Sequence, residues 1–292
     1  MSAKIIKTPG KINLFLKIIS RNQDGFHNLE SVFAFVDIFD ELKFNICNSN
    51  TANPKLNINF IGDYAKNINN KDNIITKIFS YFCKHYSINK NISLQITKNI
   101  PVGAGLGGGS SNGAFFMMLL NREFNIGLKK EELREISFNF GSDLAFFFEN
   151  KSSIIRNIGT VDSHISEFIS TPFLLVNPQI NLATKEVFSS FKNDFSQPVS
   201  NEEILQSSVI DIIKKYPNQL EKIAEKKYPE ITNIINFLYN KNPIKAKMTG
   251  SGSTCFAIFK NSKDLDKAYN SCLKEFPNYF VRKSNIIYEQ KH

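Results

Sequence analysis

The feature that most constrains the fold of this chain is a glycine-rich segment, Pro101-Val-Gly-Ala-Gly-Leu-Gly-Gly-Gly-Ser-Ser-Asn112, with five glycines among the seven residues from Gly103 to Gly109. Because glycine is entropically costly to order, such a cluster indicates a backbone that needs positive φ angles or a close approach to another group. The alternating residues 92–98 predict a strand before the segment, and the apolar residues 113–121 predict a buried helix after it. A loop that opens a helix directs free N–H groups and the helix dipole at one point, which favours a phosphate group.

Several kinds of phosphate loop can be compared with this segment. Ser110 and Ser111 add hydroxyl groups that can donate to a phosphate or contact its metal ion, but the lysine of the Walker A pattern is missing. A dinucleotide fingerprint is formally present at Gly103, Gly105 and Gly108, yet the residues before it predict a mixed sheet rather than a parallel βαβ unit. The further motifs of protein kinases are absent. A hinge without a ligand is disfavoured by the order of strand, glycines, serines and apolar helix.

The rest of the chain predicts an α+β fold, because strands and helices follow one another irregularly. Turn residues at 22–25 follow the first strand, and Asp72-Asn73 precedes a helix in the manner of a cap. A domain boundary is expected within residues 163–172, dividing the chain into residues 1–162 and 163–292. The predicted strands are 11–19, 41–46, 56–60, 92–98, 173–176 and 255–259, and the predicted helices are 74–86, 113–121, 130–140, 202–214 and 230–239.

Composition excludes several classes of protein. The chain has 292 residues, of which 42% are hydrophobic and 22% charged, an ordinary globular balance with no apolar run long enough to span a bilayer. We see no secretion signal. The four cysteines form no CxxC pair, which argues against a disulfide framework or zinc site and favours a reducing, cytoplasmic location. The net charge of +9 comes from scattered lysines, and it is compatible with anionic substrates without demonstrating them.

Three ordered motifs resemble those of the superfamily of galactokinase, homoserine kinase, mevalonate kinase and phosphomevalonate kinase, the GHMP kinases. They are Thr8-Pro-Gly-Lys-Ile-Asn-Leu-Phe-Leu16, the glycine-rich segment, and Met248-Thr-Gly-Ser-Gly-Ser-Thr-Cys-Phe256. Within this superfamily, Asp24-Gly-Phe-His-Asn28 and Gly141-Ser-Asp143 are most similar to the 4-diphosphocytidyl-2-C-methyl-D-erythritol kinase family. Residues 190–240 carry almost no resemblance.

The resemblance implies a two-domain fold, with an N-terminal ribosomal-protein-like mixed β-sheet with helices and a C-terminal α/β substrate domain. It implies ATP-dependent phosphorylation of the 2-hydroxyl of the cytidyl compound in non-mevalonate isoprenoid synthesis. ATP is the implied phosphate donor, and Mg²⁺ is expected with it. The sequence identifies no secure protein ligand for Mg²⁺, and Ser110 or Ser111 are the candidates. The partner is a small cytidyl diphosphate, with no nucleic acid or membrane, and the protein is expected to be a monomer or weak homodimer.

The resemblance gives Asp143 the role of base and Lys11 that of its charge partner. From spacing alone, Asp143 would instead be a helix N-cap before an apolar run, and Lys11 a solvated strand lysine. Asn13 shares the strand face of Lys11 and can reach the same substrate, unless it is a polar residue of an edge strand.

The resemblance also implies binding residues for both substrates. Each of these residues also has a purely structural interpretation. His27 could be a buried histidine with a backbone partner, and Phe188 a core residue. Thr249–Thr254 could be a plain β-turn, and Asn73 and Lys98 could be cap or strand-end residues. The cytidyl substrate would contact Asn13, Phe26, His27, Phe188, Thr249 and Gly250. ATP would contact Pro101, Gly103, Gly105, Gly107, Gly108, Gly109, Ser110, Ser111, Asn73 and Lys98.

Three residues depart from the pattern of the family. Ser142 and Ala145 replace the alanine and proline that usually surround the base, and loss of the proline is expected to loosen the turn that aims Asp143. Phe26 stands where the family often has tyrosine, so a hydroxyl contact is lost.

Two other functions remain as alternatives. A sister kinase would phosphorylate homoserine or mevalonate, although Asp24-Gly-Phe-His27 favours the cytidyl compound. A basic RNA-binding module would fit the positive charge, but the sequence shows no cluster of basic and aromatic residues.

Overall fold

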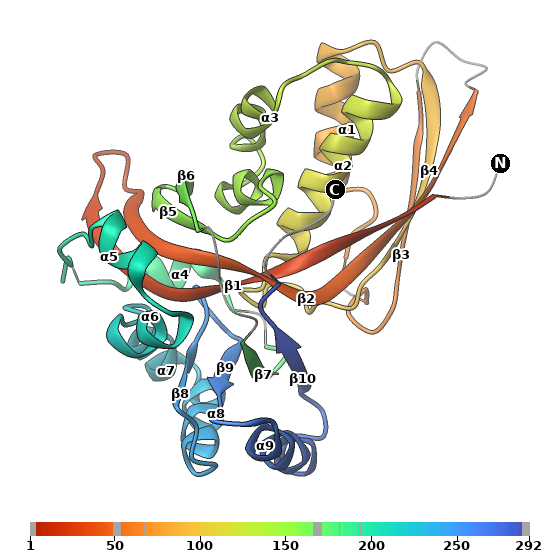
Figure 1. Ribbon diagram of the computed structural model, residues 1–292. Helices are drawn as coiled ribbons and strands as arrows, with labels where there is room; N and C mark the ends of the chain where they lie inside the picture. The colour runs from red at the N-terminus through yellow and green to blue at the C-terminus, as the bar shows by residue number, and fades with distance from the viewer. Residues whose placement is uncertain are drawn as a thin grey trace. The chain divides into compact units, whose positions relative to one another are not determined.

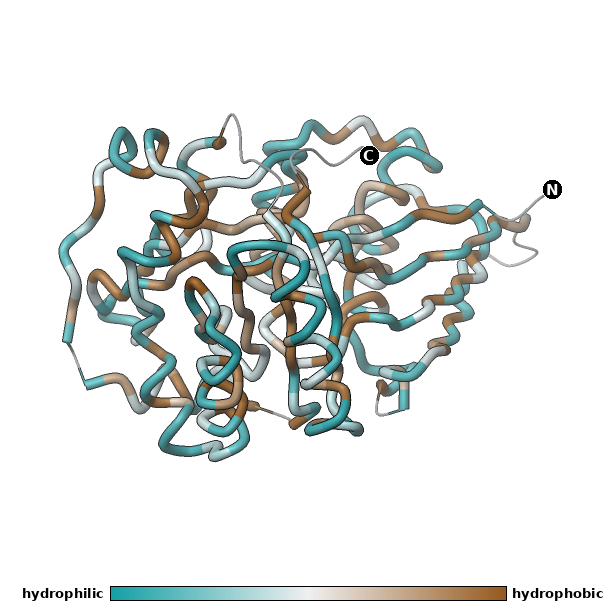
Figure 2. The backbone as a smooth tube through the Cα atoms, turned by 60° about the horizontal axis from the view of Figure 1, so that its bottom comes forward, coloured by the Kyte–Doolittle hydropathy of each residue, from teal (hydrophilic) through white to brown (hydrophobic). Residues whose placement is uncertain are grey.

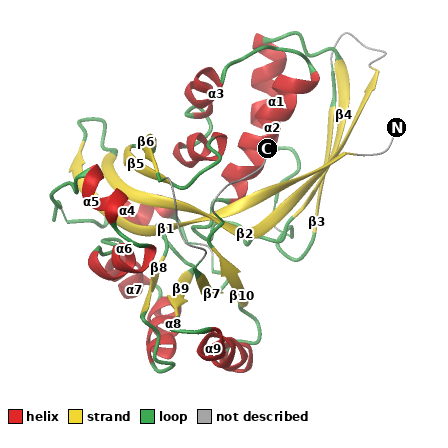
Figure 3. Cartoon of the chain, in the orientation of Figure 1, coloured by secondary structure: helices red, strands yellow, loops and turns green. Residues whose placement is uncertain are grey.

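The computed structural model describes residues 4–48, 54–66, 68–165, 171–180, 182–192 and 194–287, and Figures 1 and 3 show the order of its helices and strands. Their irregular alternation confirms the predicted α+β class. The strands are β1 (Lys4–Arg21), β2 (His27–Asn48), β3 (Leu56–Ile61), β4 (Lys90–Thr97), β5 (Ser153–Asn157), β6 (Thr160–His164), β7 (Pro172–Asn177), β8 (Lys245–Met248), β9 (Cys255–Ile258) and β10 (Phe280–Asn285). The helices are α1 (Ile74–His85), α2 (Gly108–Glu123), α3 (Lys130–Ser137), the 3-10 helix η1 (Ser142–Phe148), α4 (Thr184–Ser189), α5 (Asn201–Gln206), α6 (Val209–Lys215), α7 (Glu221–Lys227), α8 (Pro229–Tyr239) and α9 (Ser262–Glu275).

The chain forms two compact units, each assembled from separate segments of the sequence. The first unit comprises the residues up to Gly10 with Ile38–Val102 and Gly108–Glu149. The second unit comprises Lys11–Asp37, Gly103–Gly107 and the chain from Asn150 onward. Strands β1 and β2 therefore belong partly to each unit. The predicted boundary between residues 162 and 163 falls inside β6, so the division into 1–162 and 163–292 stays a sequence-based prediction that the compact units do not follow.

The first unit contains a sheet in which β4 pairs antiparallel with the second part of β2 and parallel with β3. Its strands form because apolar and polar residues alternate: Ile92, Leu94 and Ile96 of β4 are buried, whereas Ser93 between them is exposed. Helices α1 and α2 contact each other within this unit (Figure 1).

Helix α1 begins at the residue that the sequence predicts. The Asn73 side chain accepts hydrogen bonds from the backbone of Ile75 and Thr76, and the Thr76 hydroxyl accepts one from the Asn73 backbone. This capping box satisfies N–H groups that the first turn of a helix leaves without partners.

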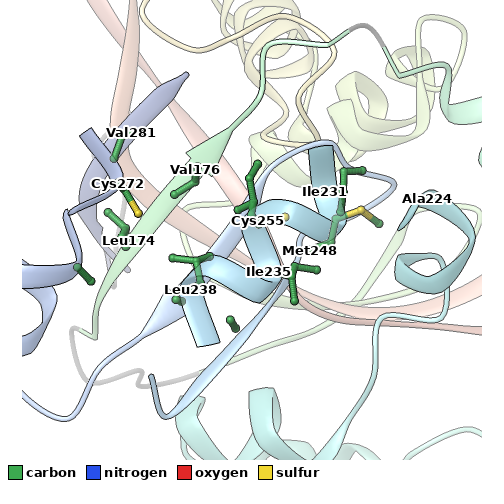
Figure 4. Packing of buried hydrophobic residues seen from close by; sticks show 14 of the residues in the cluster. Leu174, Val176, Ala224, Ile231, Ile235, Leu238, Met248, Cys255, Cys272 and Val281 are labelled. Atoms are coloured by element: carbon green, nitrogen blue, oxygen red, sulfur yellow. The ribbon is translucent and has the colours of Figure 1, made fainter. Parts of the chain in front are cut away.

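The second unit contains the pairing of β5 with the first part of β2 and of β6 with β5, together with a separate sheet in the order β10-β7-β9-β8. All pairs in this second sheet are antiparallel. Apolar residues of its strands pack against helices of the same unit, and Figure 4 shows the centre of this core. Its labelled members are Leu174, Val176, Ala224, Ile231, Ile235, Leu238, Met248, Cys255, Cys272 and Val281.

Hydrophobic and hydrophilic stretches alternate over short distances along the chain, as Figure 2 shows. Among the residues described, no helix combines the length and the apolar character needed to cross a membrane.

Two predicted elements differ from the structure. The single helix predicted at 202–214 is wrong: α5 ends at Gln206, and the Ser208 hydroxyl accepts a hydrogen bond of 3.2 Å from the Asp211 backbone to start α6. Serine side chains compete for backbone groups and so favour helix starts over helix interiors. The strand predicted at 41–46 is only the end of β2, because residues 32–36 are buried consecutively and show no alternation.

Candidate active site

The glycine-rich segment adopts a backbone with several positive φ angles, as its glycine content predicts. Gly103, Gly105 and Gly107 have φ angles of 68°, 76° and 70°, in the left-handed region that side chains disfavour. The Lys11 backbone N–H donates to the Leu106 carbonyl at 2.9 Å. The first two sequence motifs therefore meet within the second unit, and α2 begins directly after the loop, at Gly108.

The third motif holds this loop from another side. A Cβ atom on Gly105 would lie 2.8 Å from the Thr249 carbonyl oxygen and 2.9 Å from that of Gly252. The Thr254 hydroxyl donates to the Ala104 carbonyl at 2.6 Å, and the Thr254 backbone donates to the same oxygen at 3.2 Å. The turn from Thr249 to Thr254 therefore supports the glycine loop as well as reversing the chain.

The resemblance implies that this loop binds ATP, so Gly105→Ala should lower kcat/KM for ATP by at least about tenfold, because the added methyl group displaces the loop from the third motif. Gly127→Ala is the matched control. Gly127 also has a positive φ, 83°, but an added Cβ there meets no atom of the described residues within 4 Å. Steady-state kinetics and thermal unfolding of both variants separate the two effects: the control should lose only roughly 1–2 kcal/mol of stability from backbone strain. Equal kinetics in the two variants would contradict the importance of the loop contact.

The Lys11 side chain is buried, with 3% of the residue exposed, which excludes a solvated strand lysine. Its Nζ donates to Asn13 Oδ1 at 2.7 Å and lies 4.3 Å from the centre of the Phe33 ring. The Asn13 backbone donates to Thr249 Oγ1 at 2.7 Å, and Asn13 Nδ2 donates to Ser31 Oγ at 2.9 Å. Lys11 is therefore held in one orientation by a buried polar network rather than left mobile at the surface.

Asn218 is a residue of this network that the sequence did not indicate. Its Nδ2 donates to the carbonyl oxygens of Met248 at 2.9 Å and Gly250 at 2.8 Å. Gly250 has a φ of 58°, and a Cβ there would lie 3.0 Å from Asn13 Oδ1. Asn218 belongs to the stretch without motif resemblance, and an isolated asparagine after a proline gave no signal of its role.

The start of α2 lies in the first unit. Ser111 is fully buried, and its Oγ finds no hydrogen-bond partner among the residues that the structure describes. Ser110 is partly exposed. Gly109 is exposed, and an added Cβ there would have no atom within 4 Å in the part of the chain that the structure describes. A buried hydroxyl without a partner is uncommon, because more than about 90% of buried polar groups are satisfied.

Lys98, a predicted ATP contact, lies in a buried ionic network of the first unit. It is 2% exposed; its Nζ forms a buried ion pair with Asp40 and donates to Asn112 Oδ1 at 2.9 Å. Asn112 Nδ2 donates to Thr8 Oγ1 at 2.7 Å. This network joins residues of the first two motifs, and Asp40 also accepts from the Ile100 backbone at 2.9 Å.

Three other predicted ATP contacts, Pro101, Gly108 and Asn73, pack against or hydrogen-bond to neighbouring residues of the first unit. Pro101 is buried. A Cβ on Gly108 would lie 3.0 Å from Ile100 and 3.3 Å from Asp40 Oδ2, so α2 starts close against the buried pair. Asn73 uses its side chain in the α1 cap and donates from Nδ2 to the Asn69 carbonyl at 2.8 Å.

Asp143 lies in the first turn of η1, partly exposed, and is not its N-cap; that position is Gly141, with a φ of 154°. The prediction of an N-cap from spacing is therefore wrong. The five residues after Asp143 are all buried, which anchors η1 while its first turn reaches solvent.

His27 and Phe188 lie together in the second unit, with ring centres 5.6 Å apart and planes inclined by 32°. Phe191 approaches His27 edge-on at 5.9 Å. His27 Nε2 is buried and has no hydrogen-bond partner among the described residues, and burial, followed by the charge of Arg21, lowers the pKa of His27 below its ordinary 6.5. Phe26 is 62% exposed, so it is not a core residue.

Within the described ranges, no group of three or more histidine, cysteine or acidic side chains is arranged to hold a metal ion.

Comparison with known proteins first defines a class. Residues 73–150 match the family model "GHMP kinases N terminal domain" and residues 201–278 match "GHMP kinases C terminal". The second match includes most of the stretch in which the motifs gave no resemblance.

Curated relatives narrow the class. A 4-diphosphocytidyl-2-C-methyl-D-erythritol kinase of Wolbachia sp. subsp. Drosophila simulans (strain wRi) is 30% identical over 98% of this chain and 100% of its own length. One from Anaplasma phagocytophilum (strain HZ) is 31% identical over 98% of this chain and 96% of its own. The chain therefore belongs to the 4-diphosphocytidyl-2-C-methyl-D-erythritol kinase family of GHMP kinases, which confirms the resemblance drawn from the motifs.

Solved structures share the fold. A crystal structure of 4-(cytidine 5'-diphospho)-2C-methyl-D-erythritol kinase has a TM-score of 0.79 and 22% identity over 97% of this chain and 100% of that one. A homoserine kinase from Cytophaga hutchinsonii has a TM-score of 0.69 and 13% identity over 100% and 96% of the two chains.

Proposed function

We propose that the protein transfers the γ-phosphate of ATP to the 2-hydroxyl of 4-diphosphocytidyl-2-C-methyl-D-erythritol, a step of non-mevalonate isoprenoid precursor synthesis. The observation that carries this proposal is the His27–Phe188 pair, in which an imidazole nitrogen without a partner among the described residues lies beside an aromatic ring, in a chain of this family. A flat, polar-edged ring such as cytosine needs both stacking and a hydrogen bond.

In this proposal Asp143 accepts the proton of the attacking hydroxyl, and Lys11 stabilises charge on the transferred phosphoryl group. Phosphoryl transfer depends mainly on positioning and charge neutralisation. The contact of Lys11 with Asn13 and its low exposure support such a role, because an ammonium group in a water-poor site acts more strongly than one in bulk water.

ATP would be held by the backbone of Gly103, Gly105 and Gly107 and by the start of α2. Mg²⁺ would accompany it and neutralise charge on its phosphates. The buried Ser111 hydroxyl, which lacks a partner among the described residues, fits a metal or phosphate contact. Ser110 is the second candidate.

On the substrate side, His27 would hydrogen-bond the cytosine and Phe188 would stack on it. Asn13, Thr249 and Gly250 would line the path of the acceptor. The large exposure of Phe26 leaves its ring available to pack on the nucleotide, without the hydroxyl contact of a tyrosine. We further propose a cytoplasmic enzyme, monomeric or weakly dimeric, without nucleic-acid or membrane partners.

The direct test is ATP consumption with the cytidyl compound, homoserine and mevalonate offered separately to the purified protein. We expect turnover with the cytidyl compound alone. Turnover with homoserine or mevalonate instead would make the protein a sister kinase. No ATP turnover, together with steeply salt-dependent RNA binding, would favour an RNA-binding function.

Binding of the cytidyl substrate should weaken at acid pH. Since burial lowers the pKa of His27, the imidazole stays neutral at pH 7 and is protonated only below 6.5, where a charged ring loses its acceptor nitrogen. The KM for the cytidyl compound should therefore rise below that pH, while the KM for ATP changes less. In His27→Gln, which cannot titrate, this acid limb should vanish; its persistence would exclude His27 as the group responsible.

A further inference from the structure

Glu149, the residue that ends η1, is held by two cations of α3. Its carboxylate is fully buried and accepts from Lys130 Nζ at 2.7 Å and from Arg134 Nη1 at 2.8 Å, one cation on each oxygen. The Glu149 backbone N–H donates to the Phe146 carbonyl at 3.0 Å, which closes the last turn of η1. This ionic contact therefore joins the end of η1 to the first two turns of α3.

The charges on this contact are matched to their surroundings. Lys130 is the first residue of α3, where the positive end of the helix dipole disfavours a cation. A buried carboxylate beside it offsets that repulsion, and the carboxylate in turn needs a cation to be stable away from water. The Lys130 ammonium and the Glu149 carboxylate therefore stabilise each other at positions where either charge alone would be disfavoured.

Helix η1 needs such an anchor more than an α-helix would. A 3-10 helix has poorer hydrogen-bond geometry, and its seven residues carry Asp143 in the first turn and end just before Glu149. Between them the buried side chains pack tightly: a Cβ on Gly113 of α2 would lie 3.2 Å from Leu144 Cδ2. We therefore expect a shift at the end of η1 to reach Asp143, because closely packed buried side chains transmit strain.

We propose that Glu149 is a positioning residue for Asp143: bound to Lys130 and Arg134, it fixes η1 against α3 and so sets the direction of the Asp143 carboxylate. This inference rests on the proposed function only for the role of Asp143. The anchoring itself is a property of the first unit and can be measured without substrate.

The test is Glu149→Gln, which keeps the shape of the side chain and removes its charge. We expect kcat for the cytidyl compound to fall about 10- to 100-fold, because misplacing a reacting group by about 1 Å has an effect of this size, while KM for ATP changes less than about threefold. Amide hydrogen exchange should rise at residues 142–149. Arg134→Lys keeps the positive charge, so kcat should stay within about threefold of the wild-type value. Arg134→Gln should reduce kcat as Glu149→Gln does. It takes the place of Glu149→Gln in this test if that variant does not fold.

Glu123→Gln is the matched control. Glu123 lies at the end of α2 and also binds two cations, Lys4 at 3.1 Å and Arg122 at 2.9 Å, so its substitution removes a carboxylate held by two cations outside η1 and α3. Unchanged kcat in Glu149→Gln, or an equal loss in the control, would overturn the positioning role. Unchanged exchange at residues 142–149 would overturn the anchoring. A wild-type protein inactive on the cytidyl compound would overturn the proposed function and leave the exchange result to decide the anchoring.

Discussion

Asp143→Asn should reduce turnover by about 10²- to 10⁴-fold, the range for removing a general base, while ATP still binds. The substitution keeps the size of the side chain and the surroundings of η1 but cannot accept the proton of the hydroxyl. Pre-steady-state measurement of phosphoryl transfer, together with ATP binding by calorimetry, separates chemistry from binding. Lys11→Met should reduce turnover by about 10²- to 10³-fold, because it removes the cation that stabilises negative charge on the transferred phosphoryl group.

If both residues act on one transfer step, the double variant should lose much less than the product of the single effects, because residues that act as a unit are not additive. Asp266→Asn, at the exposed pair that Asp266 forms with Lys283 at 2.8 Å, is the control and should leave turnover unchanged. Near-normal turnover in Asp143→Asn would remove Asp143 from the role of base.

Lys98→Met should destabilise the protein by about 3–5 kcal/mol, because it leaves the carboxylate of Asp40 buried without its cation. Asp40 is fully buried, and its remaining donors include the backbone N–H groups of Asn99 and Ile100. Two such hydrogen bonds do not replace a full positive charge. Denaturant unfolding of the two proteins measures the difference in the free energy of unfolding.

The same substitution at an exposed pair provides the comparison. Lys283→Met should leave the free energy of unfolding almost unchanged, since the side chains of Lys283 and Asp266 are 46% and 52% exposed. Adding Asp40→Asn to Lys98→Met should recover part of the lost stability. Should Lys98→Met instead raise only the KM for ATP, the predicted nucleotide contact would hold and the structural role would be wrong.

The fold could be predicted where a local pattern specifies it. Alternation of apolar and polar residues located β3 and β4, and Asn73 located the start of α1. The long β2 was largely missed, because a strand buried on both faces carries no alternating signal. The break between α5 and α6 was missed because serines at the centre of a helical pattern are ambiguous until a backbone N–H reaches one of them.

The candidate site was predictable only in part, for a similar reason. Glycines that require positive φ angles are visible in a sequence, and so is a histidine after a tight turn. Residues whose role depends on partners far along the chain are not: nothing local to Asp40, Asn218 or Glu149 indicates what each contacts. The roles given to the individual site residues remain predictions for the variants above.

The contact between Thr254 and Ala104 joins residues 150 positions apart, and that between Asn13 and Thr249 joins residues 236 apart. During synthesis on the ribosome, at about 5–20 residues per second, the glycine-rich segment emerges on the order of ten seconds before the turn that holds it. During that interval the nascent chain exposes the glycine-rich segment without its contacts to the turn at Thr249–Thr254. A ligand that needs the supported loop can therefore bind only after the third motif has been synthesised.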